Sequence, residues 1–195
     1  MNDEDLVHLK KSIDAIHNLN EREWQAFAGI WKVVHSKRKQ IITAAGNKEN
    51  YLYFVLEGVQ RVYYFDEQER EATVVFTYFP SFGGVVDALL TEQKSKYFYE
   101  TISDSRFLQA PFQGIKQLME QYHSIETLIR KLLSLSLAGL LERLVELQCF
   151  SSEEKFRKLL HRSPHILQLV PHKYLANYLG IDPTNFSKLI NRVRI

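Results

Sequence analysis

Residues 172–191 read HKYLANYLGIDPTNFSKLIN. Apolar side chains occupy the fourth, eighth, tenth, fifteenth and eighteenth places of this stretch, which puts them on the facing sides of two short helices. Ala176 lets the two helices approach closely, and Gly180 permits the left-handed turn between them. Asp182-Pro183 suits the N-cap and the first position of the second helix. The stretch therefore predicts a helix-turn-helix.

The outward side of the second helix combines short hydrogen-bonding groups with cations. Short polar groups near a helix N-terminus can reach base edges, and cations further along suit phosphates or a guanine edge. A helix pair used only for packing is the alternative interpretation. The predicted DNA-binding residues, with one lysine from the first helix, are Lys173, Thr184, Asn185, Ser187, Lys188, Asn191 and Arg192.

The charge of the chain is divided unevenly. The formal net charge is +2, yet residues 155–195 carry eight Lys and Arg against the single acid Asp182, a net charge of +7. The rest of the chain holds 17 of its 25 basic and 22 of its 23 acidic residues, a net charge of −5. A basic end on an acidic body favours a polyanionic partner such as double-stranded DNA, with a solvated basic face as the alternative.

Upstream of this end the apolar pattern is that of short strands. Two amphipathic helices come first, over residues 3–17 and after Asn20, which can form a capping box with Glu23. Strand-like runs rich in β-branched and aromatic residues follow at 31–35, 40–43, 51–56, 59–65, 71–79, 97–102 and 106–108. Separated by turn residues, they predict an antiparallel β-barrel or roll.

A long helix is predicted from Ser124 to about Gln148. Its leucines recur at spacings of four and three, which is a heptad seam. The seam consists of Leu133, Leu137, Leu140, Leu144 and Leu147. A neighbouring apolar set consists of Leu128, Leu132, Leu135, Leu141 and Val145. We expect one face to pack on the chain's own barrel and the seam to pack on the same helix of a second copy, in a parallel homodimer. Packing of both faces within one chain is the alternative.

The predicted fold class is α+β, in three segments. Residues 1–123 are expected to form a β-roll sensor domain with flanking helices, and residues 124–148 the long dimerisation helix. Residues 149–195 are expected to form a helix-turn-helix DNA-binding domain.

This organisation resembles the CRP/FNR family of bacterial transcription regulators. YLYFVLEGVQRVYY, residues 51–64, resembles the family's barrel strand pair around a glycine, here Gly58. YLANYLGIDPTNFSKLI, residues 174–190, closely resembles its DNA-binding motif. The resemblance implies a dimer that binds DNA, RNA polymerase as a further partner of an activator, and a barrel whose ligand changes the relation of the two domains. It also implies base-reading positions at Pro183, Thr184, Asn185, Ser187 and Lys188.

FGGVVDALLTEQKSKYFY, residues 82–99, takes the place of the family's phosphate-binding cassette. The cyclic-nucleotide members have a glutamate after a Phe-Gly type turn, which binds the ribose hydroxyl, and an arginine further along, which pairs with the cyclic phosphate. Here those positions are Gly84 and, within Lys94–Lys96, Ser95. Lysine could supply a charge there but lacks arginine's bidentate fork.

We therefore predict a degenerate cyclic-nucleotide pocket that senses another ligand or none and requires no cofactor. Tyr97 and Tyr99 are expected to face an empty aromatic-lined cavity or a ligand other than a cyclic nucleotide. A regulator that responds to cyclic AMP or cyclic GMP in the ordinary way is the alternative. The candidate pocket residues are Phe82, Gly83, Gly84, Lys94, Ser95, Lys96, Tyr97 and Tyr99.

Enzymatic and metal-dependent functions are not expected. A cupin-like β-barrel enzyme, the remote alternative, needs clustered His and carboxylate ligands on adjacent strands, and the strand region offers only His35. No nucleophile–base pair stands out, so neither catalytic residues nor a metal site are predicted. Haem remains open as a ligand, since His8, His17, His35 and His123 could serve as axial ligands.

The remaining sequence features concern the compartment. The single Cys149 excludes an internal disulfide and a cluster of thiolate ligands within one chain. No apolar run approaches the roughly 20 residues that cross a bilayer. We expect a soluble, cytoplasmic protein with no membrane partner.

Overall fold

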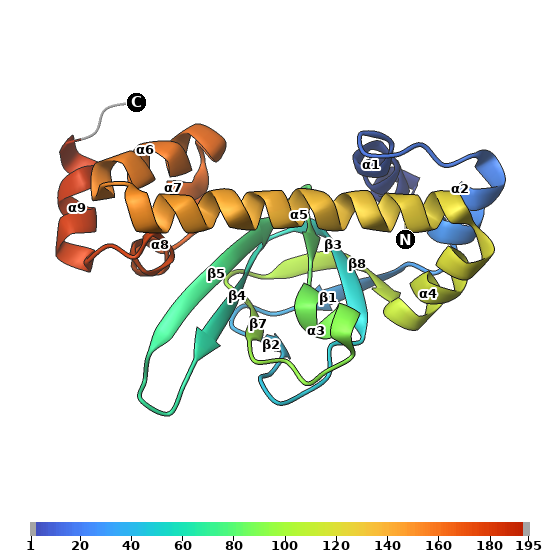
Figure 1. Ribbon diagram of the computed structural model, residues 1–195, viewed down its shortest axis with the longest axis horizontal. Helices are drawn as coiled ribbons and strands as arrows, with labels where there is room; N and C mark the ends of the chain where they lie inside the picture. The colour runs from blue at the N-terminus through green and yellow to red at the C-terminus, as the bar shows by residue number, and fades with distance from the viewer. Residues whose placement is uncertain (1–2, 193–195) are drawn as a thin grey trace.

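The computed structural model describes residues 3–192. In chain order its helices and strands are α1 (Asp3–Asp14), α2 (Glu21–Ala28), β1 (Lys32–Ser36), β2 (Ile41–Thr43), β3 (Tyr51–Glu57), β4 (Val59–Phe65), β5 (Glu71–Tyr78), β6 (Phe82–Gly83), α3 (Val86–Thr91), β7 (Phe98–Thr101), β8 (Ser105–Pro111), α4 (Phe112–Gln121), α5 (His123–Cys149), α6 (Ser152–Arg162), α7 (Ile166–Leu169), α8 (His172–Leu179) and α9 (Pro183–Arg192) (Figure 1). Arg194, one of the cations counted above, lies outside the described residues.

Within residues 3–192 the strands form a roll of two antiparallel four-stranded sheets. One sheet has the order β1-β8-β3-β6 and the other β2-β7-β4-β5, so β5 lies at an edge. Gly58 turns β3 into β4 with φ +84°, and a Cβ there would meet the carbonyl oxygen of Asp104 at 2.3 Å. Only glycine suits this turn. The strand runs predicted from sequence are confirmed, while β6 and α7 are too short to leave a periodic signal.

In the described part of the chain the core consists of three clusters. The helix-side cluster joins α1, α2, α4 and the start of α5 to one face of β3 and β8. The roll interior holds Tyr53, Val55, Val62, Val85, Ala88, Tyr99 and Phe107. The C-terminal cluster joins α6 to α9 and also includes Val59 and Ile102 of the roll. The C-terminal helices are therefore packed on the roll.

Helix α5 packs on the helix-side cluster only near its start. Ile125 and Leu128 are fully buried, and Leu133 is the last residue of α5 packed there. The expectation that the second apolar set packs on the roll is wrong for Leu135, Leu141 and Val145, which are 53–60% exposed. The reason is geometric, because α5 continues past this cluster toward the C-terminal helices (Figure 1). Leu133, which was assigned to the seam, is partly buried against the helix-side cluster of its own chain.

Local signals at the helix ends behave as the sequence predicts. Asn20 and Glu23 form the expected capping box at the start of α2. Ser151 and Glu154 form another at the start of α6. No helix among residues 3–192 has the length and apolar character needed to span a membrane.

Candidate functional site

Helices α8 and α9 form the predicted helix-turn-helix. Gly180 ends α8 in the left-handed conformation, with φ +60° and ψ +40°. The Asp182 carboxylate accepts the N–H groups of Thr184 at 2.8 Å and Asn185 at 3.2 Å. These hydrogen bonds satisfy two N–H groups that have no partner within the helix. The turn and the cap thus arise from the residues that the sequence singled out.

Helix α9 has one buried and one exposed side. Phe186 and Leu189 are buried in the C-terminal cluster. The polar and cationic residues predicted to bind DNA are all exposed: Thr184, Asn185, Ser187, Lys188, Asn191 and Arg192. Lys173 of α8 is also exposed, with Nζ 4.6 Å from the centroid of the Tyr174 ring. Packing therefore leaves the polar side of α9 open to solvent.

The second half of α5 presents an apolar surface. Leu137, Leu140, Leu144 and Leu147 of the predicted seam are 58%, 51%, 49% and 40% exposed. Contiguous exposed apolar side chains of this size mark interaction surfaces in proteins that are otherwise soluble. Within the same stretch of the helix Arg143 is buried, with its guanidinium 3.9 Å from the centroid of the Tyr178 ring in α8.

The predicted effector segment begins with a tightly packed turn at Gly83–Gly84, here called the glycine turn. Gly84 has φ +116°, and a Cβ there would lie 3.2 Å from the carbonyl oxygen of Tyr51. At Gly83 a Cβ would lie 2.3 Å from the hydroxyl oxygen of Tyr99. Tyr99 is fully buried, with its hydroxyl 3.2 Å from that of Thr77, and burial raises the pKa of the phenol. Tyr99 is thus part of the core that fills the roll.

The other predicted pocket residues do not converge on one space. Ser95 is buried, and its hydroxyl donates to the carbonyl of Tyr97 at 2.7 Å and accepts the N–H of Tyr97 at 2.9 Å. Lys94 and Lys96 are exposed. Phe82 packs on the helix-side cluster, across the sheet from the roll interior. The prediction that Phe82 and Tyr99 belong to one pocket is therefore wrong for Phe82. The side chains of consecutive residues in a strand point to opposite faces of the sheet. Among residues 3–192, no three His, Cys, Asp or Glu side chains are grouped so as to hold a metal ion.

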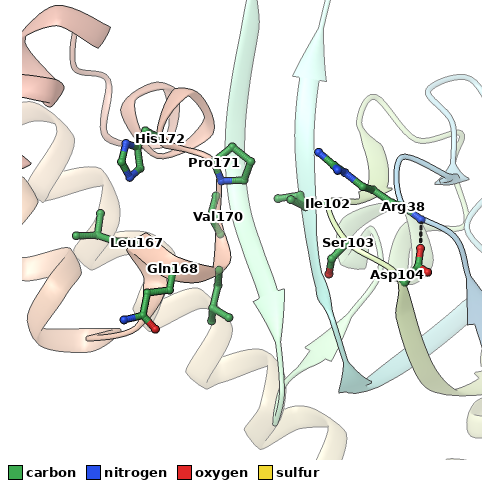
Figure 2. A pocket seen from close by; sticks show the side chains of 10 residues that line it. Arg38, Ile102, Ser103, Asp104, Leu167, Gln168, Val170, Pro171 and His172 are labelled. Carbon is green, nitrogen blue, oxygen red and sulfur yellow. Dashed lines mark hydrogen bonds between the residues drawn. The ribbon is translucent and has the colours of Figure 1, made fainter.

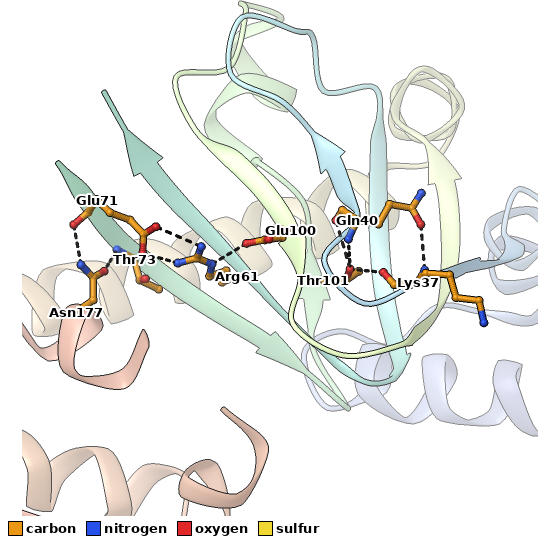
Figure 3. A network of polar contacts seen from close by, with 8 residues as sticks. All are labelled: Lys37, Gln40, Arg61, Glu71, Thr73, Glu100, Thr101 and Asn177. Carbon is orange, nitrogen blue, oxygen red and sulfur yellow. Dashed lines mark hydrogen bonds and ion pairs between the residues drawn. The ribbon is translucent and has the colours of Figure 1, made fainter. Parts of the chain in front are cut away.

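A polar network joins the roll to α8 (Figure 3). The Arg61 side chain of β4 is nearly buried and donates to Glu71 at 2.7 Å and to Glu100 at 2.9 Å. Its guanidinium also lies 3.9 Å from the centroid of the Tyr174 ring in α8. Burial alone would lower the pKa of Arg61, but hydrogen bonds and charges from both carboxylates outweigh it and raise that pKa. Beside it, Asn177 of α8 hydrogen-bonds to the backbone of β5.

An open cleft of about 710 Å³ also lies between the roll and the C-terminal helices (Figure 2). Arg38 and Asp104 stand on the roll side, where the N–H of Arg38 donates to Asp104 at 2.8 Å. Gln168 and His172 stand on the helical side. The two parts of the chain are thus in contact through α8 and β5 and separated by solvent-accessible space at this cleft.

Comparisons with known proteins agree with this architecture. Residues 33–122 match the model of the cyclic nucleotide-binding domain family. FixK2 from Bradyrhizobium japonicum is similar with a TM-score of 0.72 and 16% identity, over 84% of each chain. A protein from Eubacterium rectale described as a transcriptional regulator of the CRP/FNR family has a TM-score of 0.69 and 16% identity, over 89% of this chain and 82% of its own. The chain has the CRP/FNR fold.

A third structure with this fold is the c-di-GMP responsive global regulator CLP from Xanthomonas campestris. Its TM-score is 0.67 at 13% identity, over 89% of this chain and 91% of its own. No curated protein matches the chain. The CRP/FNR fold confirms the predicted α+β class, with an N-terminal β-roll followed by C-terminal helices.

Three residues that stabilise the CRP/FNR fold in this chain were not among the site residues predicted from the sequence. Arg61 and Asn177 connect the roll to α8, and Glu49 places a carboxylate beside the glycine turn. A signal existed for Arg61, because a lone cation amid the apolar residues of a central strand needs buried anionic partners. Asn177 and Glu49 carry no comparable local signal.

Proposed function

We propose that the chain is a homodimeric, sequence-specific DNA-binding transcription regulator and not an enzyme. The observation that carries the proposal is the α8–α9 pair, whose apolar side is buried while the polar side of α9 is exposed. A helix with this division can lie in the major groove and direct short polar groups at base edges. The excess of basic residues over 155–195 supports the accompanying phosphate contacts.

The apolar surface of α5 supports the dimer. Two copies of the helix packed along the seam would bury these leucines, as in a coiled coil, and would present two copies of α9 to successive half-sites. In this proposal residues 1–123 form the sensor domain, 124–148 the dimerisation helix and 149–195 the DNA-binding domain. The regulator acts in the cytoplasm, and as an activator it would contact RNA polymerase.

Selection of fragments from the source genome tests the proposal. The purified protein should retain particular fragments at least about 10³-fold more tightly than random DNA, with affinity that falls steeply as salt increases. Equal binding to all fragments at moderate salt would refute sequence-specific recognition.

Two substitutions with a matched control sharpen this experiment. Asn185→Ala should relax the preference at one base pair, and Lys173→Ala should weaken binding to all sequences and lower the salt slope by about one. Lys11→Ala removes an exposed cation of α1 and should change neither quantity. If the three variants behave alike, α8 and α9 do not form the interface.

A response to cyclic AMP or cyclic GMP is the second candidate function, favoured by the family match over residues 33–122. Against it, Gly84 stands where the resemblance places a ribose-binding glutamate, and Tyr99 fills the space over Gly83. We therefore propose a roll that does not respond to these nucleotides. Calorimetry with each of them separates the candidates, and micromolar binding by either would establish the second one.

A further inference from the structure

Glu49 places a carboxylate in the interior beside the glycine turn. The residue precedes β3 and is 6% exposed. Its Oε2 accepts the hydroxyl hydrogen of Thr43 at 2.6 Å and the N–H of Val85 at 3.3 Å. Its Oε1 accepts the N–H groups of Asn50 at 3.0 Å and Tyr51 at 3.2 Å. The carboxylate thus has two hydrogen bonds at each oxygen.

These four donors come from separate parts of the roll: β2, the first residue of β3 with the residue before it, and the residue that follows the glycine turn. All four are neutral groups. Burying a carboxylate is unfavourable unless hydrogen bonds replace the hydration that it loses. The donors therefore form a cradle for an anion, and Glu49 fills it.

The same carboxylate helps to fill the space over the glycine turn. A Cβ on Gly84 would lie 3.7 Å from Oε2 of Glu49, and a Cβ on Gly83 would lie 2.3 Å from the hydroxyl of Tyr99. The resemblance places the ribose-binding glutamate of cyclic-nucleotide members at Gly84. Side chains of the protein therefore occupy the space over the glycine turn, where the resemblance places the ribose contact of such a ligand.

We propose that Glu49 is a built-in anionic occupant of the roll. Its carboxylate takes the place of the acidic group of an effector and holds the roll in its occupied form without any added ligand. This inference rests on the proposed function and deepens it, because it makes DNA binding independent of an effector. It also identifies the ligand class that the cradle accepts once the side chain is removed, namely a small carboxylate or another oxyanion.

Chemical rescue of the full-length chain tests the proposal. Glu49→Ala should melt below the unsubstituted protein, and formate should raise the Tm of the variant saturably by about 2–4 °C relative to chloride at equal ionic strength. The unsubstituted protein and Glu120→Ala, which removes an exposed carboxylate from α4, should show no saturable difference between the two salts. Equal responses in all three proteins, or no response in Glu49→Ala, would overturn the proposal.

Two further readouts keep the test decisive. If Glu49→Ala does not fold in chloride, its refolding yield in formate replaces the Tm, and a yield no higher than in chloride counts against the proposal. Glu49→Gln fills the same space without charge, so formate should not raise its Tm. A rise in Glu49→Gln like that in Glu49→Ala would mean that formate acts elsewhere.

DNA binding separates this inference from the proposed function. The affinity of Glu49→Ala for a selected DNA fragment should rise at least about tenfold when formate is added. The affinity of the unsubstituted protein for the same fragment should not change with formate, phosphate or cyclic AMP. If formate raises the Tm of Glu49→Ala but the protein shows no specific DNA binding, the proposed regulatory function is refuted and the proposal that Glu49 is a built-in anion is supported. Specific DNA binding without formate rescue would refute the built-in anion alone.

Discussion

Asn177 of α8 pairs with the edge of the β-roll at Thr73. Its Oδ1 accepts the N–H of Thr73 at 2.6 Å, and its Nδ2 donates to the carbonyl of Glu71 at 2.7 Å. Because β5 is an edge strand, its outward backbone groups have no further strand beside them in the described sheet. The side-chain amide supplies the donor and the acceptor that a neighbouring strand would offer, and so fixes α8, with α9, on the roll.

Asn177→Ala should loosen this contact. The substitution leaves the N–H of Thr73 without its partner, and an unsatisfied buried donor costs about 1–3 kcal/mol. The free energy of unfolding in urea should fall by that amount, and hydrogen exchange at the Thr73 amide should accelerate roughly tenfold or more, as about 1.4 kcal/mol implies.

A substitution in α9 provides the control for Asn177→Ala. The amide of Asn191 is exposed, and among residues 3–192 it donates to the carbonyl of Ser187 within the same helix. Asn191→Ala should therefore change the free energy of unfolding by no more than about 0.5 kcal/mol. Unchanged exchange at Thr73 in Asn177→Ala would show that the pairing contributes nothing to the attachment of α8.

Arg61→Met should lower the free energy of unfolding of the chain. Breaking a buried ion pair costs about 3–5 kcal/mol, and we expect about 3 kcal/mol because the Glu71 side chain is 32% exposed. Without the cation, the Glu100 carboxylate, whose side chain is 14% exposed, loses the ion-pair partner that Arg61 provides.

An exposed arginine–glutamate pair gives the matched control for Arg61→Met. Arg157 bonds to Glu153 one turn earlier in α6, with side chains 55% and 38% exposed. Arg157→Met should cost no more than about 0.5 kcal/mol. Urea titrations of both variants provide the comparison. Equal losses in both would mean that Arg61 behaves as a surface residue.

Leu140→Lys should dissociate the proposed dimer without unfolding the chain. The leucine is 51% exposed in the single chain and belongs to none of the three core clusters, so its replacement removes little intramolecular packing. A charge inside a helix seam, in contrast, would be buried against a second copy. Leu135→Lys is the control, because Leu135 lies away from the seam on α5 and is 60% exposed. Sedimentation equilibrium should report a monomer for Leu140→Lys and a dimer for Leu135→Lys. Dimers in both would exclude the seam as the interface.

Strand β3 shows how much of this fold can be predicted from the sequence. The run over residues 51–56 is apolar and aromatic throughout, and the strand is buried on both faces. Short-range patterns likewise predict the two capping boxes, the left-handed turn at Gly180 and the helix cap at Asp182. Each of these features depends on residues that are near one another in the chain, where spacing and residue type carry the information.

Contacts between distant segments lie beyond such patterns. Glu49 meets Val85 across 36 residues, and Asn177 meets Thr73 across 104. Neither side chain stands out from its neighbours in sequence, because its role depends on which backbone groups the fold brings to it. Phe82 illustrates the opposite error. It is near the predicted pocket residues in sequence and was therefore grouped with them, but its side chain points to the other face of the sheet, away from the roll interior.

Gly83→Ala measures how tightly the roll is filled. The new methyl group would lie 2.3 Å from the hydroxyl oxygen of Tyr99, and Tyr99 is fully buried, so the clash must displace packed core. Overpacking of this kind costs about 1–3 kcal/mol. Tyr99→Phe removes the clashing oxygen, so the double variant should lose less stability than the two single losses added together.

The matched control for this cycle is Gly114→Ala in α4. There the nearest heavy atom to a Cβ is 3.6 Å away, which is ordinary van der Waals contact. Alanine should stabilise the helix by up to about 1 kcal/mol. Urea unfolding of the single and double variants gives the coupling between Gly83 and Tyr99. Additive losses would mean that the roll has spare volume over the glycine turn, which is the condition that a ligand larger than a side chain would require.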